Sequence, residues 1–315
     1  EIKPDLSFVM GVIDDLTPKI KPGDLILLES TSPVGTTEII LNKLEEKGID
    51  ISSINLAYCP ERVLPGNVLH ELLENDRVVG GVNSTSTNKA ALFYKSFVRG
   101  DIFQTNAKTA ELCKLTENSF RDVNIAFANE LSVICAEEGI NVWELIELTN
   151  KHPRVNVLQP GTGVGGHCIS VDPWFIVSRN PSNSKLIQTA RAVNNFKPKW
   201  VVENILNVLG HQNFRGNKPK VACLGISYKP DIDDLRESPA LEVVRGLKNS
   251  GCDVLVVEPN IIKSDEFEFF DLEVAIQSAD LIVSLVAHSS FKKLKCIQTL
   301  RKLEALDYCG LLKRG

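Results

Sequence analysis

Hydrophobic and polar residues follow three different patterns along the chain. From residue 4 to about 106, short apolar runs such as 24–31 are followed by amphipathic stretches such as 36–48, whose apolar residues recur with helical spacing. An alternation of strands and helices predicts a parallel sheet with helices packed on it. We therefore assign residues 1–106 to a first α/β domain.

The middle of the chain has a different pattern. Residues 108–139 keep helical periodicity over about eight turns. The stretches 141–151 and 184–210 are helical as well, and we expect the second of them to be bent or broken around Pro198. A central, mostly helical domain over residues 107–211 is the prediction.

Alternation returns after the polar linker 211–219. The helix expected over 238–251 has a proline near its start and a glycine at its end, which is the usual order. Strands are expected at 220–228, 252–260 and 281–288. Residues 212–315 thus form a second α/β domain, and the fold class is α/β, with two Rossmann-like parallel-sheet domains joined by a central helical block.

Composition narrows the class of partner. The net charge of -5 gives no electrostatic case for binding nucleic acid or an anionic membrane. Apolar runs such as 281–287 have the length of a strand and fall short of the ~20 residues of a membrane span, and the polar start of the chain does not resemble a signal peptide. Eight scattered cysteines without a C-x-x-C pair indicate a reducing, cytoplasmic location.

Residues 161–168 read GTGVGGHC and raise the question of a cofactor site, because Gly161, Gly163 and Gly166 form a G-x-G-x-x-G pattern. A dinucleotide-binding turn follows a strand and opens a helix, so that the phosphates lie at the helix N-terminus. Here the pattern follows a glutamine and a proline, and the residues after it have no helical periodicity. We expect these glycines instead to let a ligand or another backbone segment come close to Cys168.

Cys168 is the cysteine that this loop would present for chemistry. An isolated cysteine is more often a small, inert core residue. The flanking glycines would be costly in an ordinary core, however, and Asp172 follows close enough to share a site. His167 is the neighbour of Cys168, and neighbours in an extended chain point to opposite faces, so we do not expect the two to form a catalytic pair.

Five motifs, in the same order, resemble those of the UDP-glucose/GDP-mannose dehydrogenase family. They are ESTSPVGT (29–36), CPERVLPG (59–66), ELCKLTENSFRDVNIAFANE (111–130), GTGVGGHCISVDP (161–173) and SYKPDIDDLRESPA (227–240). The resemblance extends over nearly the whole chain. Within the family, residues 150–175 are most similar to the branch that acts on UDP-N-acetyl-D-mannosamine.

The resemblance implies an enzyme that oxidises the C6 alcohol of this nucleotide sugar to a carboxylate with two NAD and one water. It makes 1–106 a partial NAD-binding Rossmann domain, 107–211 a helical dimerisation domain with the cysteine loop, and 212–315 a UDP-sugar-binding Rossmann-like domain. Family members begin with a βαβ unit that carries a G-x-G-x-x-G turn. We expect the first Rossmann domain of this chain to lack that N-terminal βαβ half.

The same resemblance assigns catalytic roles. Cys168 would attack the aldehyde intermediate to give a thiohemiacetal and then a thioester, which water hydrolyses. Lys114, Asn118 and Arg121 recur at i, i+4 and i+7 on one helix face, which on pattern alone is more often a solvated stripe. Matched to the family, Lys114 stabilises the oxyanion, Asn118 positions the attacking water, and Arg121 binds substrate.

Two more candidates follow strands of the first domain, where ligands of parallel sheets bind. Thr31 could be a simple helix cap and Glu61 a surface acid. By resemblance, Thr31 lies near the nicotinamide and the catalytic water, and Glu61 is a general acid/base, with Arg62 and Val63 lining the sugar site. Asp172 matches the family aspartate that lies four residues after the cysteine.

Further substrate and cofactor contacts are implied in the second half of the chain. Tyr228 and Lys229 resemble a UDP-binding pair, Arg236 an arginine that reaches NAD, and Gly165 belongs to the substrate site. Pro65 and Val171 stand where the UDP-glucose branch has a glutamate and a lysine, so that branch's acid/base scheme does not transfer directly. The alternatives are a UDP-N-acetylglucosamine or UDP-glucose 6-dehydrogenase, and a non-catalytic nucleotide-sugar-binding protein.

The long helix also predicts a homodimer. Residues 123–135 hold more large apolar side chains than one buried stripe requires, and an identical helix across a two-fold axis would bury the surplus. Arg154 matches a family arginine that enters the neighbouring subunit's substrate site, and His152 would accompany it.

Overall fold

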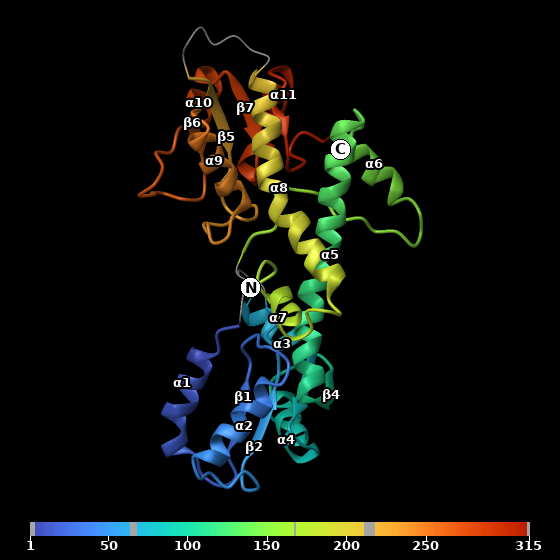
Figure 1. Cartoon of the computed structure of the whole chain (residues 1–315), viewed down its shortest axis with the longest axis vertical. Coiled ribbons are helices and arrows are strands. Elements are labelled where there is room, and N and C mark those ends of the chain that lie inside the picture. Colours follow the sequence, from blue (N-terminus) through green and yellow to red (C-terminus); the bar gives the residue numbers. More distant parts are fainter. Residues whose placement is uncertain (1–3, 64–67, 167, 211–217, 314–315) are drawn as a thin grey trace. The chain divides into compact units, whose positions relative to one another are not determined.

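A computed structural model describes residues 4–63, 68–166, 168–210 and 218–313, so Pro65 and His167 lie outside the described residues (Figure 1). The chain divides into two compact units. Unit 1 is Glu1–Ser119 with Asp172–Lys185, and unit 2 is Phe120–Val171 with Leu186–Gly315. The three-domain division 1–106, 107–211 and 212–315 stays a prediction.

Unit 1 is built on a four-stranded sheet of order β1-β2-β3-β4. Its strands are β1 (Leu25–Leu28), β2 (Asn55–Tyr58), β3 (Arg77–Gly81) and β4 (Ile102–Asn106). Its helices include α1 (Ser7–Leu16), α2 (Thr36–Glu46), α3 (Val68–Glu74) and α4 (Ser84–Lys95). Side chains of β2 alternate between the faces, since Leu56 packs with α1 and α2 whereas Ala57 packs with α4.

The pairing of this sheet corrects one expectation. β1 and β2 are parallel and so are β3 and β4, but β2 and β3 are antiparallel, with Ala57 opposite Gly81. A parallel β2–β3 pair would need a crossover helix packed on the sheet. The intervening α3 buries none of its residues, so it covers neither face and the sheet is mixed.

The central helices lie close to the expected bounds, and one helix was not expected. They are α5 (Ala107–Glu137), α6 (Val142–Thr149), α7 (Asp172–Arg179) and α8 (Lys185–Gly210). α8 runs through Pro198 as one helix, so of the two expected outcomes, a bend or a break, the break is excluded. α7 was not expected at all, because its eight residues carry little periodicity; its N-terminal Asp-Pro is the signal that could have indicated it.

In unit 2, buried polar side chains join α5 to α8. Arg191 Nη1 donates to Asp122 Oδ1 at 2.7 Å, and both residues are fully buried. Asn194 Nδ2 donates to the same carboxylate oxygen, and Asn129 Nδ2 donates to Asn194 Oδ1. Removal of one partner would leave a buried charge unpaired, which makes this cluster a strong constraint on how the two helices pack.

The C-terminal part of unit 2 is a three-layer α/β domain. Its strands are β5 (Lys220–Leu224), β6 (Asp253–Val257), β7 (Leu281–Ser284) and β8 (Leu306–Asp307), and they pair in parallel in the order β6-β5-β7-β8. α8 and α9 (Pro239–Asn249) pack on one face, and α10 (Leu272–Ser278) and α11 (Leu294–Lys302) on the other (Figure 1). The predicted parallel sheet is confirmed here.

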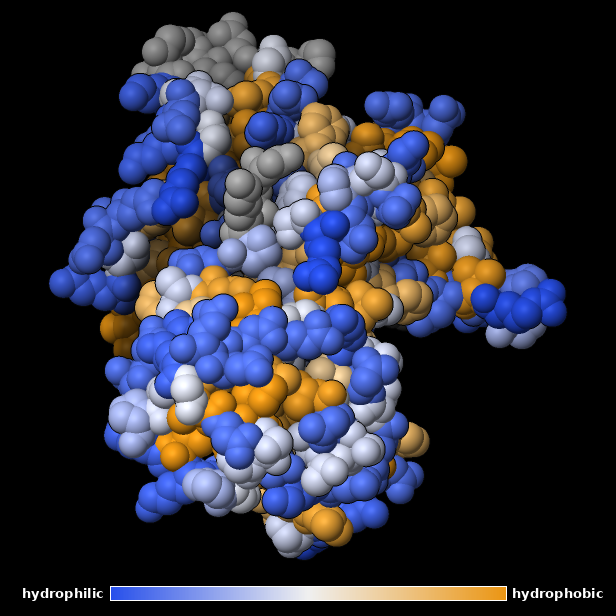
Figure 2. Space-filling model, turned by 60° about the horizontal axis from the view of Figure 1, so that its bottom comes forward, coloured by the Kyte–Doolittle hydropathy of each residue, from blue (hydrophilic) through white to orange (hydrophobic). Residues whose placement is uncertain are grey.

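Apolar side chains reach the surface in several places, seen as orange patches among the hydrophilic ones (Figure 2). On α5, Phe120, Phe127 and Ile134 are 69%, 53% and 46% exposed. They are spaced by seven residues and so lie along one side of the helix. Among the described residues, no helix combines the length and the apolar character needed to cross a membrane.

Candidate active site

The glycine loop of unit 2 is shaped by the segment that begins at Tyr228 and ends at Pro239. A Cβ built on Gly165 would lie 2.4 Å from the carbonyl oxygen of Glu237, and one on Gly163 would lie 2.9 Å from the Pro239 Cβ. Gly163 and Gly166 also have φ of +146° and +82°, values that favour glycine. Gly163, Gly165 and Gly166 are therefore explained by the close approach of another segment, as the sequence suggested, whereas Gly161 has no such contact.

This packing brings together three of the predicted residues. Gly166 N–H donates to the Arg236 carbonyl oxygen at 3.1 Å, and a Cβ on Gly165 would meet the Tyr228 Cβ at 2.8 Å. The amide of Gly166 is thus used within the protein. The glycine loop that leads to Cys168 lies directly against the proposed nucleotide-binding residues.

Cys168 is half-buried, and the chain turns immediately after it, since Val171 N–H donates to the Cys168 carbonyl oxygen. Burial raises the pKa of six other thiols, which makes their reactive thiolate forms scarce. They are Cys59, Cys135, Cys223, Cys252, Cys296 and Cys309. Cys113 lies within α5 rather than on a loop, so Cys168 is the cysteine best placed for chemistry.

In unit 1, Asn118 and Asp172 are brought together although 54 residues separate them. Asn118 Nδ2 donates to Asp172 Oδ2 at 2.5 Å, and Asp172 is buried at the first position of α7. Lys114 lies one turn before Asn118 on α5 and has no hydrogen-bond or ion-pair partner among the described residues. An amide held by a buried carboxylate beside a half-buried ammonium can bind and polarise a carbonyl or a water molecule.

A second group lies beyond the end of β2. Glu61 Oε1 accepts hydrogen bonds from the backbone N–H of Arg62 and Val63, at 2.6 and 2.8 Å, and lies 3.6 Å from the buried Arg77 guanidinium. The Arg62 side chain forms an ion pair with Glu117 of α5. Glu61 is therefore oriented by its own loop, and its carboxylate is more than one-third exposed.

Thr31 follows β1, and the residues around it fit only part of a dinucleotide. Glu29 and Ser30 are exposed at the carboxyl end of β1, where a parallel sheet binds ligands. The N-terminus of α2, however, is occupied by the buried Glu111 carboxylate, which accepts from Gly35 N–H and Thr37 N–H at 2.5 and 2.8 Å. The residues present can hold one end of NAD, but this helix N-terminus does not offer its amides to a diphosphate.

Three predicted substrate contacts of unit 2 are exposed. Arg121 lies on α5, and His152 and Arg154 lie in the turn after α6, where Arg154 N–H donates to His152 Nδ1 at 3.3 Å. Neither arginine has an anionic partner among the described residues. Lys229, also in unit 2, places its ammonium 5.8 Å from the centre of the Tyr228 ring.

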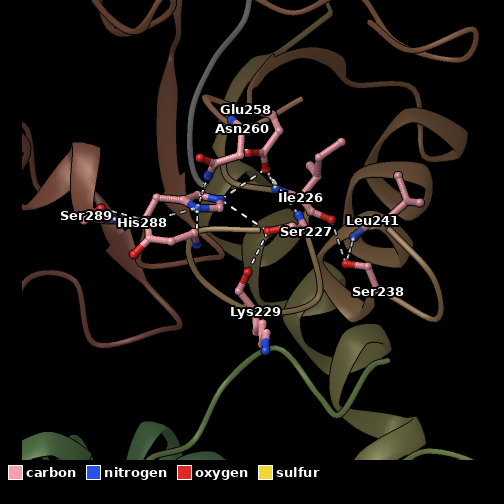
Figure 3. Close-up of polar contacts among 10 residues, drawn as sticks. Ile226, Ser227, Lys229, Ser238, Leu241, Glu258, Asn260, His288 and Ser289 are labelled. Carbon is pink, nitrogen blue, oxygen red and sulfur yellow. Dashed lines mark hydrogen bonds and ion pairs between the residues drawn. The ribbon is translucent and has the colours of Figure 1, made fainter. Parts of the chain in front are cut away.

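A buried polar cluster in unit 2 was not anticipated from the sequence. Glu258, which follows β6, contacts His288, which follows β7, with Oε2 and Nε2 3.1 Å apart (Figure 3). Burial alone would raise the pKa of Glu258, but hydrogen bonds from His288 and from the Ile226 and Asn260 amides outweigh it, and the pKa is lowered. The signal was present, since an acid directly after a strand of such a sheet often faces a nucleotide.

The chain was compared with models of known protein families. Residues 108–196 match the central domain of the UDP-glucose/GDP-mannose dehydrogenase family, residues 1–98 its NAD binding domain, and residues 222–312 its UDP binding domain. Nearly the whole chain is therefore covered by one family.

Individual relatives agree with this match. The chain is 52% identical to UDP-N-acetyl-D-mannosamine dehydrogenase of Yersinia pestis, over 93% of this chain and 74% of the relative. It is 51% identical to an NDP-N-acetyl-D-galactosaminuronic acid dehydrogenase of Ralstonia solanacearum, over 93% of this chain and 71% of the relative.

Solved structures give the same result. The fold is similar to that of UDP-D-ManNAc dehydrogenase from Pyrococcus horikoshii, with a TM-score of 0.91 and 38% identity over 99% of this chain and 75% of that one. Sequence motifs, fold and relatives agree, and the chain belongs to the NAD-dependent UDP-glucose/GDP-mannose dehydrogenase family.

Proposed function

We propose that the protein oxidises the C6 alcohol of UDP-N-acetyl-D-mannosamine to the carboxylate. The observation that carries the proposal is the contact of the glycine loop, next to Cys168, with Tyr228 and the Arg236 backbone. A nucleotide bound at Tyr228 and Lys229 would thus bring its sugar towards the cysteine. The relatives of 50 to 52% identity named UDP-N-acetyl-D-mannosamine dehydrogenase support this substrate.

Cys168 supplies the nucleophile. Its Sγ adds to the aldehyde carbon formed by the first oxidation, and the second oxidation turns the resulting thiohemiacetal into a thioester. Water then attacks the thioester carbon, the C–S bond breaks, and the thiol and the sugar carboxylate are released. NAD, when bound, accepts the hydride in each oxidation.

The groups of unit 1 stabilise and orient these steps. Lys114 provides the positive charge for the oxyanion that forms at C6, and Asn118 holds the attacking water in an orientation fixed by its hydrogen bond to Asp172. Glu61 exchanges protons with the reacting oxygen, and Arg62 and Val63 line the sugar. Thr31 and Arg236 would contact NAD, and Arg121 and Gly165 the substrate.

The protein acts as a homodimer in this proposal. The exposed row of Phe120, Phe127 and Ile134 on α5 is an apolar face that a second copy of the same helix would bury. His152 and Arg154, on the exposed turn after α6, complete the partner's substrate site. We place the protein in the cytoplasm, because eight scattered cysteines without a C-x-x-C pair are typical of a reducing compartment.

The test is product analysis with purified protein, NAD and UDP-N-acetyl-D-mannosamine. We expect two NADH for each uronate, detected by absorbance and mass spectrometry. Cys168→Ser should form no uronate yet bind the nucleotide sugar, because serine is a poor nucleophile for the acyl intermediate. Normal uronate formation by this variant would remove Cys168 from the mechanism.

A second candidate differs only in the sugar. The 51% identical Ralstonia solanacearum relative is named for N-acetyl-D-galactosaminuronic acid, so the corresponding galactosamine nucleotide belongs in the assay. UDP-N-acetylglucosamine and UDP-glucose complete the panel. The substrate with the highest kcat/KM identifies the sugar, and a clear preference for one other than the mannosamine form would overturn our choice.

A further inference from the structure

The loop between β5 and α9 carries the proposed nucleotide contacts, yet it has no regular secondary structure. It spans residues 225–238 and presents Tyr228, Lys229 and Arg236. Asp231 and Glu237 within it have φ of +62° and +51°, an unfavourable region for residues with a side chain. Such conformations persist only where surrounding contacts hold them, and in this loop side chains from outside it make those contacts.

Glu258 holds the start of the loop. Its Oε2 accepts from the N–H of Ile226 at 2.8 Å and of Ser227 at 3.2 Å, and its Oε1 accepts from Asn260 N–H at 3.0 Å (Figure 3). The carboxylate lies where a dinucleotide fold would place a phosphate, at amides that follow the first strand. These amides are consequently unavailable to a ligand and serve to fix the loop.

His288 holds the middle of the loop. Its Nδ1 accepts from Asp231 N–H at 2.9 Å and lies 2.7 Å from the Asn260 amide nitrogen. Because Nδ1 accepts from the Asp231 N–H, the ring carries its proton on Nε2, which donates to Glu258. One buried imidazole therefore joins the Glu258 carboxylate to the strained turn at Asp231.

Further contacts tie the remaining positions. Ser227 Oγ donates to the carbonyl oxygen of Lys229 at 2.8 Å, and Ser238 Oγ donates to that of Ile226 at 2.7 Å. The Asp231 carboxylate accepts from the N–H and hydroxyl of Ser289, each at 2.8 Å. The backbone on both sides of Tyr228 and Lys229 is thereby fixed by hydrogen bonds within the protein.

We propose that His288 and Glu258 are positioning residues for the nucleotide sugar, which act by holding residues 226–231 in the one conformation that presents Tyr228 and Lys229. The inference rests on the proposed function, which assigns nucleotide binding to this loop. Substrate binding should therefore depend on two buried side chains that follow β6 and β7. Chemistry at C6 should depend on them little.

The test separates the two contacts of His288 by conservative replacement. His288→Asn keeps an acceptor near the Nδ1 position for Asp231 N–H, whereas His288→Gln keeps a group near Nε2 and loses that acceptor. We expect His288→Ala and His288→Gln to raise the Kd of UDP, measured by calorimetry, by on the order of tenfold, and His288→Asn to raise it less. In turnover, KM for the nucleotide sugar should rise while kcat changes little.

Leu300→Ala is the matched control, because Leu300 is fully buried in the same domain and outside this cluster. It should lower Tm and leave the Kd of UDP unchanged. If His288→Ala lowers Tm with no change in the Kd of UDP, the cluster is only structural and the proposal is wrong. If His288→Ala does not fold, Glu258→Gln and the two conservative variants, His288→Asn and His288→Gln, give the same comparison.

Failure of the proposed function has a different result. In that case wild-type protein would not bind UDP, or Lys229→Ala and Tyr228→Ala would bind it as tightly as wild type. Weaker binding in those two variants together with unchanged binding in all His288 and Glu258 variants would overturn only the positioning role.

Discussion

Lys114 is the residue whose role is most sharply testable. Its ammonium is half-buried on α5, near the Asn118 amide that Asp172 holds, and no described residue neutralises it. Lys108, on the same helix, instead forms an exposed ion pair with Glu38 at 2.8 Å. The two lysines thus have the same side chain, but only Lys108 has an ion-pair partner among the residues that the structure describes.

We expect Lys114→Ala to lower kcat by on the order of 10²-fold, the usual cost of losing one group that stabilises an oxyanion, with a smaller change in KM. Lys108→Ala is the control and should retain wild-type kcat, because a surface ion pair contributes little. Steady-state NADH formation measures both. A rise in KM alone would make Lys114 a binding residue.

Candidate site residues could be predicted where a sequence motif contains them. Side chains that come together only in the folded protein were not predicted. Cys168, Lys114 and Asn118 could be named because their motif gives each a position. Glu258 and His288 were not named: the position of Glu258 after a strand was a general signal, and nothing in the sequence pairs it with His288, 30 residues away. Their pairing is a consequence of β6 and β7 ending at the same edge of the sheet.

Among the helices, α8 carries an unusual buried cation. Lys197 is 3% exposed, donates to Ser132 Oγ at 2.6 Å and stacks 3.8 Å from the centre of the Trp200 ring, with no carboxylate in ion-pair contact among the described residues. Burial lowers the pKa of Lys197 from 10.5 to about 7. The native protein therefore binds fewer protons at this site than the unfolded chain does.

This difference fixes the sign of a pH effect. Between pH 7 and about 10.5, unfolding takes up a proton at Lys197, so the free energy of unfolding gains a contribution that rises with pH by up to ~1.4 kcal/mol per unit. Lys197→Met should remove this rise and stabilise the protein near pH 7 by about 1 to 4 kcal/mol. Urea denaturation at several pH values tests it, and parallel curves for both proteins would refute it.

At the scale of elements, hydrophobic periodicity predicted the long helices and the parallel C-terminal sheet, and it failed for short elements. α5 and the parallel C-terminal sheet were expected because many positions agree. α3 and α7, of seven and eight residues, hold too few turns to show a period. The antiparallel β2–β3 pair was not predicted, because strand direction depends on whether the connecting helix packs on a face of the sheet, and the sequence does not show this for α3.

At the scale of the whole molecule, the proposed homodimer, in which Arg154 enters the partner's substrate site, predicts complementation between inactive subunits. Cys168→Ser and Arg154→Ala should each be inactive or nearly so, since each removes a group that both sites require. After subunit exchange, one of the two sites in a hybrid dimer is wholly wild type. Random mixing should then restore about a quarter of normal activity.

Size-exclusion chromatography with light scattering should show the dimer before mixing, and differently tagged subunits should confirm exchange. No recovery among exchanged subunits would mean that Arg154 serves its own chain. A monomer throughout would contradict the homodimer itself.

The close packing of the glycine loop on the segment from Tyr228 to Pro239 has a thermodynamic consequence. When two segments pack this closely, ordering one of them restricts the other. A ligand that orders the first segment therefore reduces the conformational entropy that the second segment loses when it binds its own ligand. Linkage requires the effect to be mutual. Uridine nucleotide bound at Tyr228 would alter the equilibrium constant for reversible attachment of a group to the Cys168 thiol. The attached group would alter the affinity for the nucleotide by the same factor.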